Sequence, residues 1–145
     1  MTNTVTISCS IDTTDPAAQI GFEVWVNDQQ FFNTDHVQAK QQISIEISDD
    51  DSEHELKFIM KNKTANDTAV DEAGNIITDA RLVITDTAFD EIQLGYMLME
   101  QAVYHHDFNG SGVQTQEKFY GEMGCNGIVS LKFTTPLYLW LLENM

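Results

Sequence analysis

The sequence predicts an all-β protein, folded as an antiparallel β-sandwich of the jelly-roll type with a C-terminal hairpin and a short apolar terminal segment. Apolar and polar residues alternate with period two in several segments, and turn-forming residues separate these segments. No stretch of useful length repeats apolar residues at helix spacing. Residues 4–11 illustrate the pattern, because Val5, Ile7, Cys9 and Ile11 alternate with Thr and Ser, as expected of a half-buried strand.

Two hairpins are predicted in the first half of the chain. Residues 21–27 point Phe22, Val24 and Val26 to one side, and Asn27-Asp28 then offers turn residues before the next strand, 29–32. Residues 41–48 alternate again, and the acidic stretch 49–52 leads into a further strand at 55–61. We interpret 41–61 as the second hairpin.

The middle of the chain is less regular. Residues 63–74 are polar and are predicted to form a long loop, and a strand follows at 76–85. Residues 89–99 are interpreted as one or two short strands, and 99–104 and 116–123 as further strands around a turn at 107–112. An Asn-Gly pair at 126–127 predicts a hairpin turn before the last strand, 128–135.

The C-terminal segment, from residue 135 onward, lacks the alternation of the strands before it. Thr135 as the N-cap, with Pro136 at the first helical position, predicts a helix start, and 137–142 are apolar around the whole circumference. A short element cannot bury so many large side chains against one sheet. We therefore expect it to close one end of the sandwich on one side and to contact a partner chain on the other, through residues Leu137, Tyr138, Leu139, Trp140, Leu141 and Leu142. Residues 1–98 are predicted as the sandwich core and 99–145 as a hairpin extension of the same single domain.

Charge excludes some classes of partner. The chain has 145 residues, of which 7 are Lys or Arg and 23 are Asp or Glu, giving a formal net charge of −16. Such a surface repels phosphate backbones and anionic lipid heads, so nucleic acid and membranes are not expected as partners. The acidity also has a simpler interpretation, which is solubility.

Cysteine usage and the N-terminal residues bear on metal binding and location. Cys9 and Cys125 lie near opposite ends of the chain without a C-x-x-C spacing, so no zinc site is expected, and Cys9 is predicted to be a buried thiol. The first residues lack the basic start and apolar run of a signal peptide, and no apolar run has the length of a membrane span.

Residues 21–92 resemble the small β-sandwich carbohydrate-binding modules of the calcium-dependent, xylan-binding kind. The resemblance lies in strand order and hairpin placement: VWVNDQQFF, then ISIEISDDDSEHELKFIMKN, then DARLVITDTAFDEI. The tail MGCNGIVSLKFTTPLYLWLLENM has no place in that family. As a whole, the chain looks like the small accessory proteins of tailed-phage virions, and this second resemblance implies a location in the virion after synthesis in the host cytoplasm.

Two carboxylate-rich segments are candidates for calcium, which takes six to eight oxygen ligands. The run Asp49 to Asp51 lacks the spacing of a known calcium loop and is equally explained as a solvated turn that discourages edge pairing. In the family resembled, calcium lies among loop carboxylates. That resemblance makes the second segment the better candidate, with ligands Asp67, Asp71, Glu72 and Asn75.

Three further residues are candidates for a ligand platform or a catalytic site. Trp25 alternates away from the Phe22 side of its strand, so it is either covered by the C-terminal extension or free to act as a platform for a sugar or a protein. His105 and His106 are adjacent and would point to opposite faces of a strand, which argues against a shared metal ion. No nucleophile or phosphate-loop motif is present, and we predict that the chain is not an enzyme.

Two functions follow as hypotheses. The first is a non-enzymatic virion component, a capsid decoration or tail-attached protein, present as a homo-oligomer or in many copies and bound to other virion proteins. The alternative is a calcium-assisted carbohydrate-binding module for a polysaccharide or host glycan. The exposed apolar terminus favours the first, and the carboxylate-rich loops favour the second.

Overall fold

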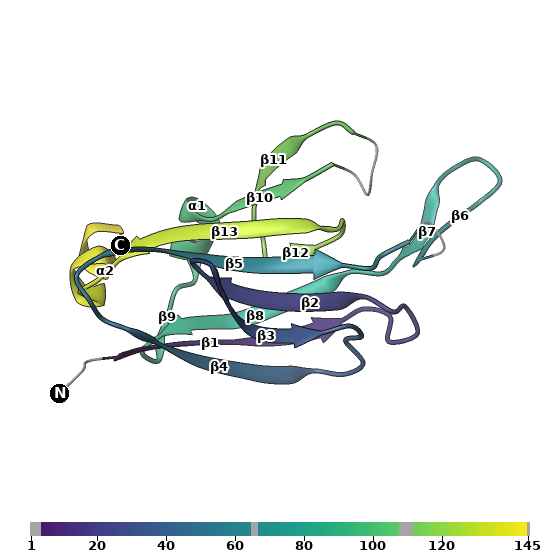
Figure 1. Cartoon of the computed structure of the whole chain (residues 1–145). Coiled ribbons are helices and arrows are strands. Elements are labelled where there is room, and N and C mark those ends of the chain that lie inside the picture. The colour runs from purple at the N-terminus through teal and green to yellow at the C-terminus, as the bar shows by residue number, and fades with distance from the viewer. Residues whose placement is uncertain (1–3, 65–66, 108–111, 145) are drawn as a thin grey trace.

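The computed structural model describes residues 4–64, 67–107 and 112–144. Its element order, with bounds, is β1 (Thr4–Thr13), β2 (Gly21–Val26), β3 (Gln29–Thr34), β4 (Gln41–Ser48), β5 (Glu53–Lys61), β6 (Thr68–Val70), β7 (Ile76–Asp79), β8 (Leu82–Phe89), β9 (Ile92–Gln93), α1 (Tyr96–Gln101), β10 (Val103–His106), β11 (Thr115–Lys118), β12 (Glu122–Met123), β13 (Gly127–Thr134) and α2 (Leu137–Asn144). The strands form two stacked antiparallel sheets with a small projecting hairpin (Figure 1). The predicted all-β sandwich is confirmed.

The smaller of the two stacked sheets has the order β12-β8-β1-β4, with β9 paired to β8. Strand β1 lies in its interior, where it pairs with β4 on one side and with β8 on the other. Its apolar residues, from Val5 to Ile11, are buried as the alternation predicts. On β4 the pattern is equally regular, because Ile43, Ile45 and Ile47 are buried and the polar residues between them are exposed.

The larger sheet has the order β11-β10-β13-β5-β2-β3 among the described strands. Strand β5 is at its centre, with β2 on one side and β13 on the other. Strands β10, β11 and β13 all come from 99–145, so this segment supplies half of the larger sheet. The predicted C-terminal hairpin is the β10–β11 pair. Of the turn expected at 107–112, residues 108–111 lie outside the described residues.

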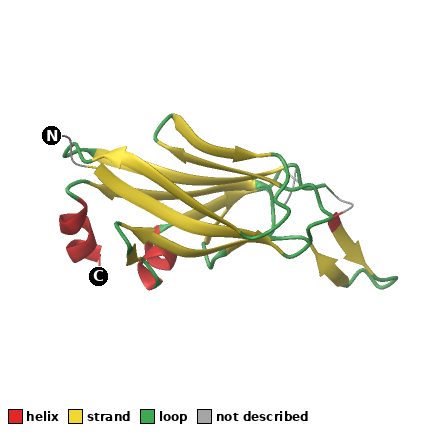
Figure 2. Ribbon diagram, turned by 90° about the horizontal axis from the view of Figure 1, so that it is seen from below, coloured by secondary structure: helices red, strands yellow, loops and turns green. Residues whose placement is uncertain are grey.

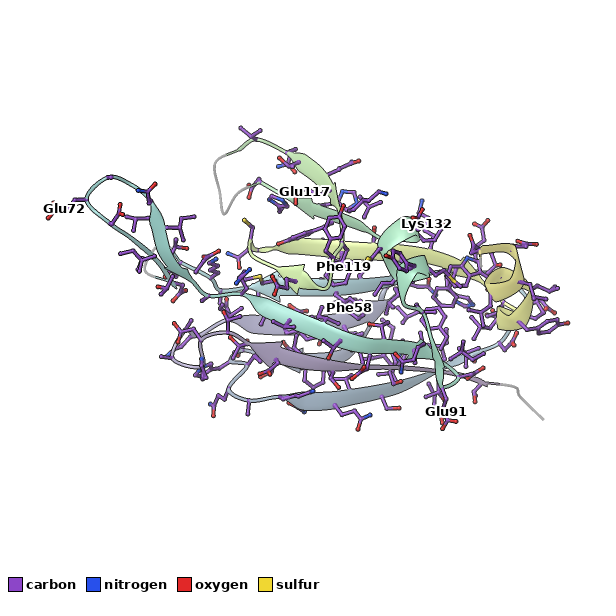
Figure 3. All side chains as sticks on the ribbon, turned by 180° about the vertical axis from the view of Figure 1, so that it is seen from behind. Phe58, Glu72, Glu91, Glu117, Phe119 and Lys132 are labelled. Atoms are coloured by element: carbon purple, nitrogen blue, oxygen red, sulfur yellow. The ribbon has the colours of Figure 1, made fainter. Side chains whose placement is uncertain are left out.

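The core lies between the two sheets. Phe58 and Phe119 are fully buried within it, with ring centroids 6.5 Å apart (Figure 3). A second aromatic group closes the end nearest α2, where Phe89, Phe133 and Trp140 contact one another. Burying aromatic side chains of this size provides much of the apolar stabilisation of a sandwich.

Two predicted hairpins are wrong. Strand β4 pairs with β1 in the smaller sheet, whereas β5 pairs with β2 and β13 in the larger one, so residues 49–52 cross between sheets. The Asn126-Gly127 pair likewise precedes a change of sheet, because β12 pairs with β8. The amide of Asn126 accepts a hydrogen bond from the backbone N–H of Lys63 and donates one to the carbonyl of the same residue, 3.0 and 2.9 Å, which ties this turn to the end of β5.

The predicted loop at 63–74 and the strand after it form a projecting arm instead. Strands β6 and β7 pair with each other and extend away from the sandwich (Figures 1 and 2). Three large apolar side chains on this arm are exposed: Val70, Ile76 and Ile77. We call residues 67–79 the arm.

Two short helices lie near the end of the sandwich opposite the arm (Figures 1 and 2). The strands expected within 89–104 are in part helix α1, which buries Met97 and Leu98. The predicted C-terminal helix is confirmed as α2, but Thr135 does not cap it, because its hydroxyl contacts Ser52 and Asp50 instead. Neither helix, nor any other in the described part of the chain, has the length and apolarity needed to cross a membrane.

Candidate functional site

Trp25 lies on the solvent side of the larger sheet, which we call the outer face. Phe22, Val24 and Val26 alternate with it on β2 and are buried in the core, so Trp25 and Glu23 point outward. The register places Trp25 between Gln30 of β3 and Lys57 of β5. Its side chain is half-buried.

The indole ring of Trp25 is held by its neighbours. Its Nε1–H donates a hydrogen bond of 2.8 Å to Oε1 of Glu23, and Nε2 of Gln30 donates to the same oxygen at 2.5 Å. Nζ of Lys61 lies 3.2 Å from the other oxygen, Oε2. The hydrogen bond from Trp25, with those from Lys61 and Gln30, lowers the pKa of Glu23 although burial opposes the shift. The ionised carboxylate therefore fixes the ring in place.

A row of side chains crosses the outer face from Trp25. Paired positions run from Trp25 to Lys57, then to Ser130, Val103 and Lys118 on successive strands. Adjacent strands are spaced by about 4.8 Å, so the first three positions span roughly 10 Å. The row combines one aromatic ring with hydrogen-bonding groups.

The outer face also holds most of the cations in this acidic chain. Of the 7 Lys and Arg residues, four point outward from this sheet, on β5, β11 and β13: Lys57, Lys61, Lys118 and Lys132. Lys57 contacts Glu55 at 3.5 Å, and Lys61 contacts both Glu23 and Asp35 at 3.2 Å. The face is thus a mixed, locally balanced surface, in contrast to the net charge of the whole chain.

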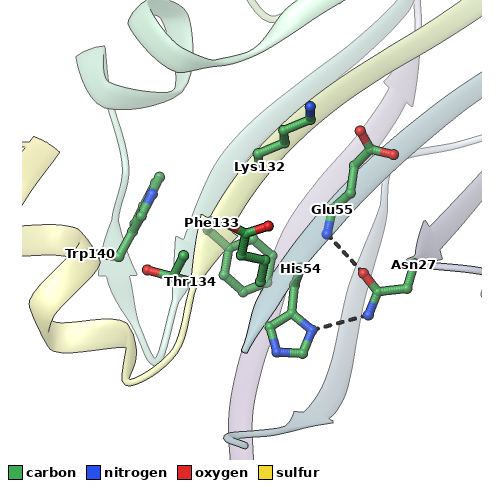
Figure 4. Close-up of a pocket in the computed structure, with 8 residues that line it drawn as sticks. Asn27, His54, Glu55, Lys132, Phe133, Thr134 and Trp140 are labelled. Carbon is green, nitrogen blue, oxygen red and sulfur yellow. Dashed lines mark hydrogen bonds between the residues drawn. The ribbon is translucent and has the colours of Figure 1, made fainter. Parts of the chain in front are cut away.

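A cleft of about 480 Å³ lies at the end of this face, beside α2 (Figure 4). The pairing of β5 with β13 sets Glu55 opposite Lys132 and Glu53 opposite Thr134. Buried rings form the inner wall: His54, Phe133 and Trp140. A cleft with polar groups along the rim and rings behind them suits a ligand that has both hydroxyl groups and apolar C–H surface.

His54 in this cleft is a structural residue. Oδ1 of Asn27 accepts the backbone N–H of Glu55 at 2.9 Å, so the amide N–H of Asn27 faces Nδ1 of His54 at 3.0 Å (Figure 4). Nδ1 must then accept, and the proton on Nε2 points to Oδ1 of Asp50, 2.9 Å away. The nearby hydroxyl of Ser52 donates to the same Asp50 oxygen at 2.5 Å.

This arrangement differs from a nucleophile relay. In such a relay the imidazole lies between the hydroxyl and the carboxylate, with one ring nitrogen toward each. Here Ser52 and Asp50 both lie on the Nε2 side of His54, and the other nitrogen is bound to Asn27. The network holds the 49–52 crossing against β5 instead of activating a hydroxyl.

The structure does not bring the four predicted calcium ligands together. Asp71 accepts backbone N–H groups of Ala73 and Asn75 at 3.0 and 2.9 Å, and the bond from Asn75 is the largest cause of its lowered pKa. Asp67 accepts the backbone N–H of Thr64 in a separate turn. Glu72 lies at the tip of the arm (Figure 3). Across the described ranges, no three His, Cys, Asp or Glu residues are grouped as metal ligands.

The six predicted partner-binding residues divide between two sides of α2. Leu137, Trp140 and Leu141 are buried, whereas Tyr138, Leu139 and Leu142 are exposed. Trp140 is only 6% exposed and packs on Phe89 and Phe133. It therefore belongs to the core, and the exposed three are the residues available to a partner.

The two histidines on β10 take the opposite orientations that the alternation predicts. His106 is buried, with Nε2 3.2 Å from Oε1 of Glu117. His105 is half-buried on the outer face, 3.4 Å from the hydroxyl of Ser130. They do not face a common ion.

Apart from Trp140, which was predicted to contact a partner, sequence reasoning did not single out the cleft residues. Alternation on each strand does point Glu53, Glu55 and Lys132 outward. These residues meet because β5 pairs with β13, and this pairing joins segments more than 60 positions apart. No local signal in the sequence predicts that pairing.

Comparison with known proteins gives a structural likeness but no sequence family. No family model and no curated protein matches the sequence. A solved structure of the selenomethionine form of vCBM60, reported in work on two families of calcium-dependent carbohydrate-binding modules linked by circular permutation, superposes with a TM-score of 0.54 and 11% identity. It covers 88% of this chain and 89% of that chain.

A second solved structure is vCBM60 in complex with galactobiose, with a TM-score of 0.46 and 14% identity over 89% of this chain and 97% of that chain. The first likeness shows that the chain has the β-sandwich fold of a carbohydrate-binding module. It extends over most of both chains, and therefore over more of this chain than residues 21–92, which carry the sequence resemblance.

Proposed function

We propose that this chain is a non-catalytic carbohydrate-binding module whose ligand lies on the outer face of the larger sheet. The observation that carries the proposal is the held indole of Trp25 within a row of polar side chains. An indole presents a flat apolar surface to the C–H face of a sugar ring. Lys57 on the adjacent strand and Ser130 one strand further offer hydrogen bonds to hydroxyl groups. The fold shared with a carbohydrate-binding module supports the same assignment.

The cleft beside α2 would extend this site toward a second part of an oligosaccharide. Asn27 follows Trp25 by two positions, and its side chain holds the backbone of Glu55 in the cleft wall. Glu55 and Lys132 then supply an acceptor and a donor at the rim. The proposed ligand is therefore a chain of several sugar units lying along β5.

Calcium is not part of the proposed contacts. The solved structure with the shared fold comes from a calcium-dependent family, but the described residues of this chain do not fit such a site, because Asp67 and Asp71 are used in separate turns. We infer that binding depends on the side chains of the outer face alone. Binding should then persist in the presence of EDTA, and its loss there would instead support calcium dependence.

The test is affinity electrophoresis of the whole chain in gels that contain neutral polysaccharides, followed by calorimetry with oligosaccharides of any retarding polymer. Trp25→Ala should weaken binding about tenfold or more, as expected for a central aromatic contact. Tyr120→Ala is the matched control, because Tyr120 is an exposed aromatic in the link between β11 and β12. Its affinity should be unchanged, with circular dichroism confirming both folds.

Two outcomes would overturn the assignment. If no polysaccharide of a broad panel retards the chain, carbohydrate binding is excluded as its function. If Tyr120→Ala abolishes retention and Trp25→Ala does not, the chain binds carbohydrate elsewhere and the outer face is the wrong site.

A structural role in a phage virion is the second candidate. The exposed apolar residues of α2 and of the arm lie toward opposite ends of the molecule, as is useful in a protein that joins two neighbours (Figure 1). Mass spectrometry of purified particles would test this role. Deleting α2 would be a poor variant, because Trp140 and Leu141 belong to the core, so Leu139→Ser with Leu142→Ser is preferable.

A further inference from the structure

A groove of about 490 Å³ lies between α1 and α2 at the helical end of the sandwich. Most of its lining is apolar, and we call it the helix-end groove: Ile92, Leu94, Tyr96, Met97 and Leu141, with Gln93, Glu100, Gln101 and Asn144. Leu94, Met97 and Leu141 are buried and form its floor. Ile92 and Tyr96 on its border are 52% and 81% exposed.

Beyond Leu141, three further apolar side chains of α2 lie outside the groove lining. Tyr138 and Leu142 are four positions apart, and Leu139 and Leu142 three apart, so the three share one side of the helix. All three are exposed. Exposed apolar side chains gathered on one side of a helix are typical of an interaction site.

The charges around this surface have a single sign. Glu100 is the charged residue of the groove lining, Glu143 follows on α2, and Asp90 and Glu91 form the turn before β9. Figure 3 shows Glu91 at this same end of the molecule. Within the described lining of the groove there is no Lys or Arg, and Lys132 lines the separate cleft on the other side of α2.

The charge distribution discriminates between candidate occupants. A second copy of this chain docked at the same surface would bring these carboxylates against their own counterparts, and like charges brought together across an interface are costly. An anionic surface has the same difficulty. A segment with apolar residues on one side and Lys or Arg beside them would satisfy both the groove and its rim.

We propose that the helix-end groove binds a cationic amphipathic helix of a partner protein. The apolar side of that helix would lie over Ile92, Tyr96 and Leu142, and its basic residues would face Glu100, Glu143 and the Asp90-Glu91 turn. Such docking follows the helix-in-groove mode of recognition, with apolar anchors at helix spacing. The acidic rim would accelerate association and exclude acidic partners.

The experiment uses the whole chain and a labelled helical peptide of leucine and lysine, with the leucines on one face. Fluorescence anisotropy should show saturable binding that weakens as salt rises. Tyr96→Ser with Leu142→Ser should weaken it about tenfold or more. Glu100→Gln with Glu143→Gln should weaken binding and reduce its salt dependence.

Two matched variants separate the groove from general attraction to an acidic protein. Ile77→Ser with Ile76→Ser removes as much exposed apolar surface from the arm and should leave binding unchanged. Trp25→Ala should also leave it unchanged, which keeps this site separate from the proposed carbohydrate site.

Three different outcomes would contradict the proposal. Equal weakening by the arm and groove variants would show attraction without a site, and the proposal would fail. Self-association in the ultracentrifuge that Tyr96→Ser with Leu142→Ser removes would assign the groove to a second copy instead. Stronger binding of the matching leucine–glutamate peptide would exclude a basic partner.

Discussion

The ammonium of Lys63 lies 2.5 Å from Oδ1 of Asp79 and joins the first residues after β5 to the last residue of β7. The Lys63 side chain is 1% exposed, and its Nζ also donates to the carbonyl of Gly124 at 2.6 Å. Thr68 donates to the same Asp79 oxygen at 2.6 Å. These bonds fasten both strands of the arm to the sandwich.

Removing one partner of this pair should destabilise the chain strongly. Asp79→Asn leaves the Lys63 ammonium buried without its counter-charge, and breaking a buried pair in this way costs about 3 kcal/mol. Urea denaturation would measure the loss. Arg81→Gln is the control, because the Arg81–Glu122 pair at 2.8 Å is exposed on both sides and contributes about 0.5 kcal/mol. Equal losses in the two variants would contradict the structural role of Lys63.

The carboxylate of Asp79 also makes the free energy of unfolding depend on pH in the acid range. Burial raises the pKa of Asp79, but the hydrogen bonds from Lys63 and Thr68 and the charge of Lys63 outweigh burial, and the pKa lies below its ordinary 3.8. Protons then bind the unfolded chain more readily. The contribution of Asp79 is present above pH 3.8 and is lost as pH falls through the lower, folded-state pKa. Asp79→Asn should flatten this part of the pH profile, and an unchanged slope would contradict the linkage.

The two cysteines should differ in reactivity. Burial raises the pKa of Cys9 to about 12, so its thiolate is scarce and its sulfur is inaccessible. Cys125 is half-buried and its pKa is also raised, mainly by burial. Titration with a thiol reagent should modify Cys125 slowly in the native state and both residues in denaturant. Fast modification of Cys9 in the folded chain would show that β1 opens.

Substitutions on the two sides of α2 should have different effects. Trp140→Ala removes a ring whose centroid lies 5.8 Å from that of Phe89, and it should lower the free energy of unfolding by about 3–5 kcal/mol. Leu142→Ala, at a 68% exposed position, should change it by less than about 0.5 kcal/mol. Thermal melts of both variants would test this, and a mild effect of Trp140→Ala would place that ring outside the core.

Alternation was sufficient to predict the fold class and the burial of most strand residues. It identified the inward side of β1 and the outward position of Trp25 from the residues alone. It could not assign strands to sheets, since the pattern on β4 and β5 is the same whether they pair or face each other. The turn at Asn126-Gly127 misled for a related reason, because the amide of Asn126 is engaged by Lys63, more than 60 positions away.

The sequence predicts the aromatic residue of the candidate site, Trp25, but not the residues that surround it. Trp25 stands out as a bulky ring on the polar side of a strand. The row from Lys57 to Ser130 and the opposition of Glu55 and Lys132 arise from the β5–β13 pairing. The arm was missed because its apolar residues are exposed, so they lack the one-sided alternation of a sandwich strand.

The central position of β13 has a consequence for biosynthesis. One edge of β5 pairs with β2 and the other pairs with residues 127–134. A ribosome must therefore translate residues 127–134 before the larger sheet can close. Until then the partial sheet of β3, β2 and β5 has an unpaired edge at β5. Residues of β5 that are buried in the folded chain, such as Phe58, are still exposed. Sheets completed by such distant segments form slowly and expose aggregation-prone edges while they wait. The nascent chain is therefore at its most vulnerable just before β13 emerges, and chaperones that hold unfolded chains would be most useful at that moment.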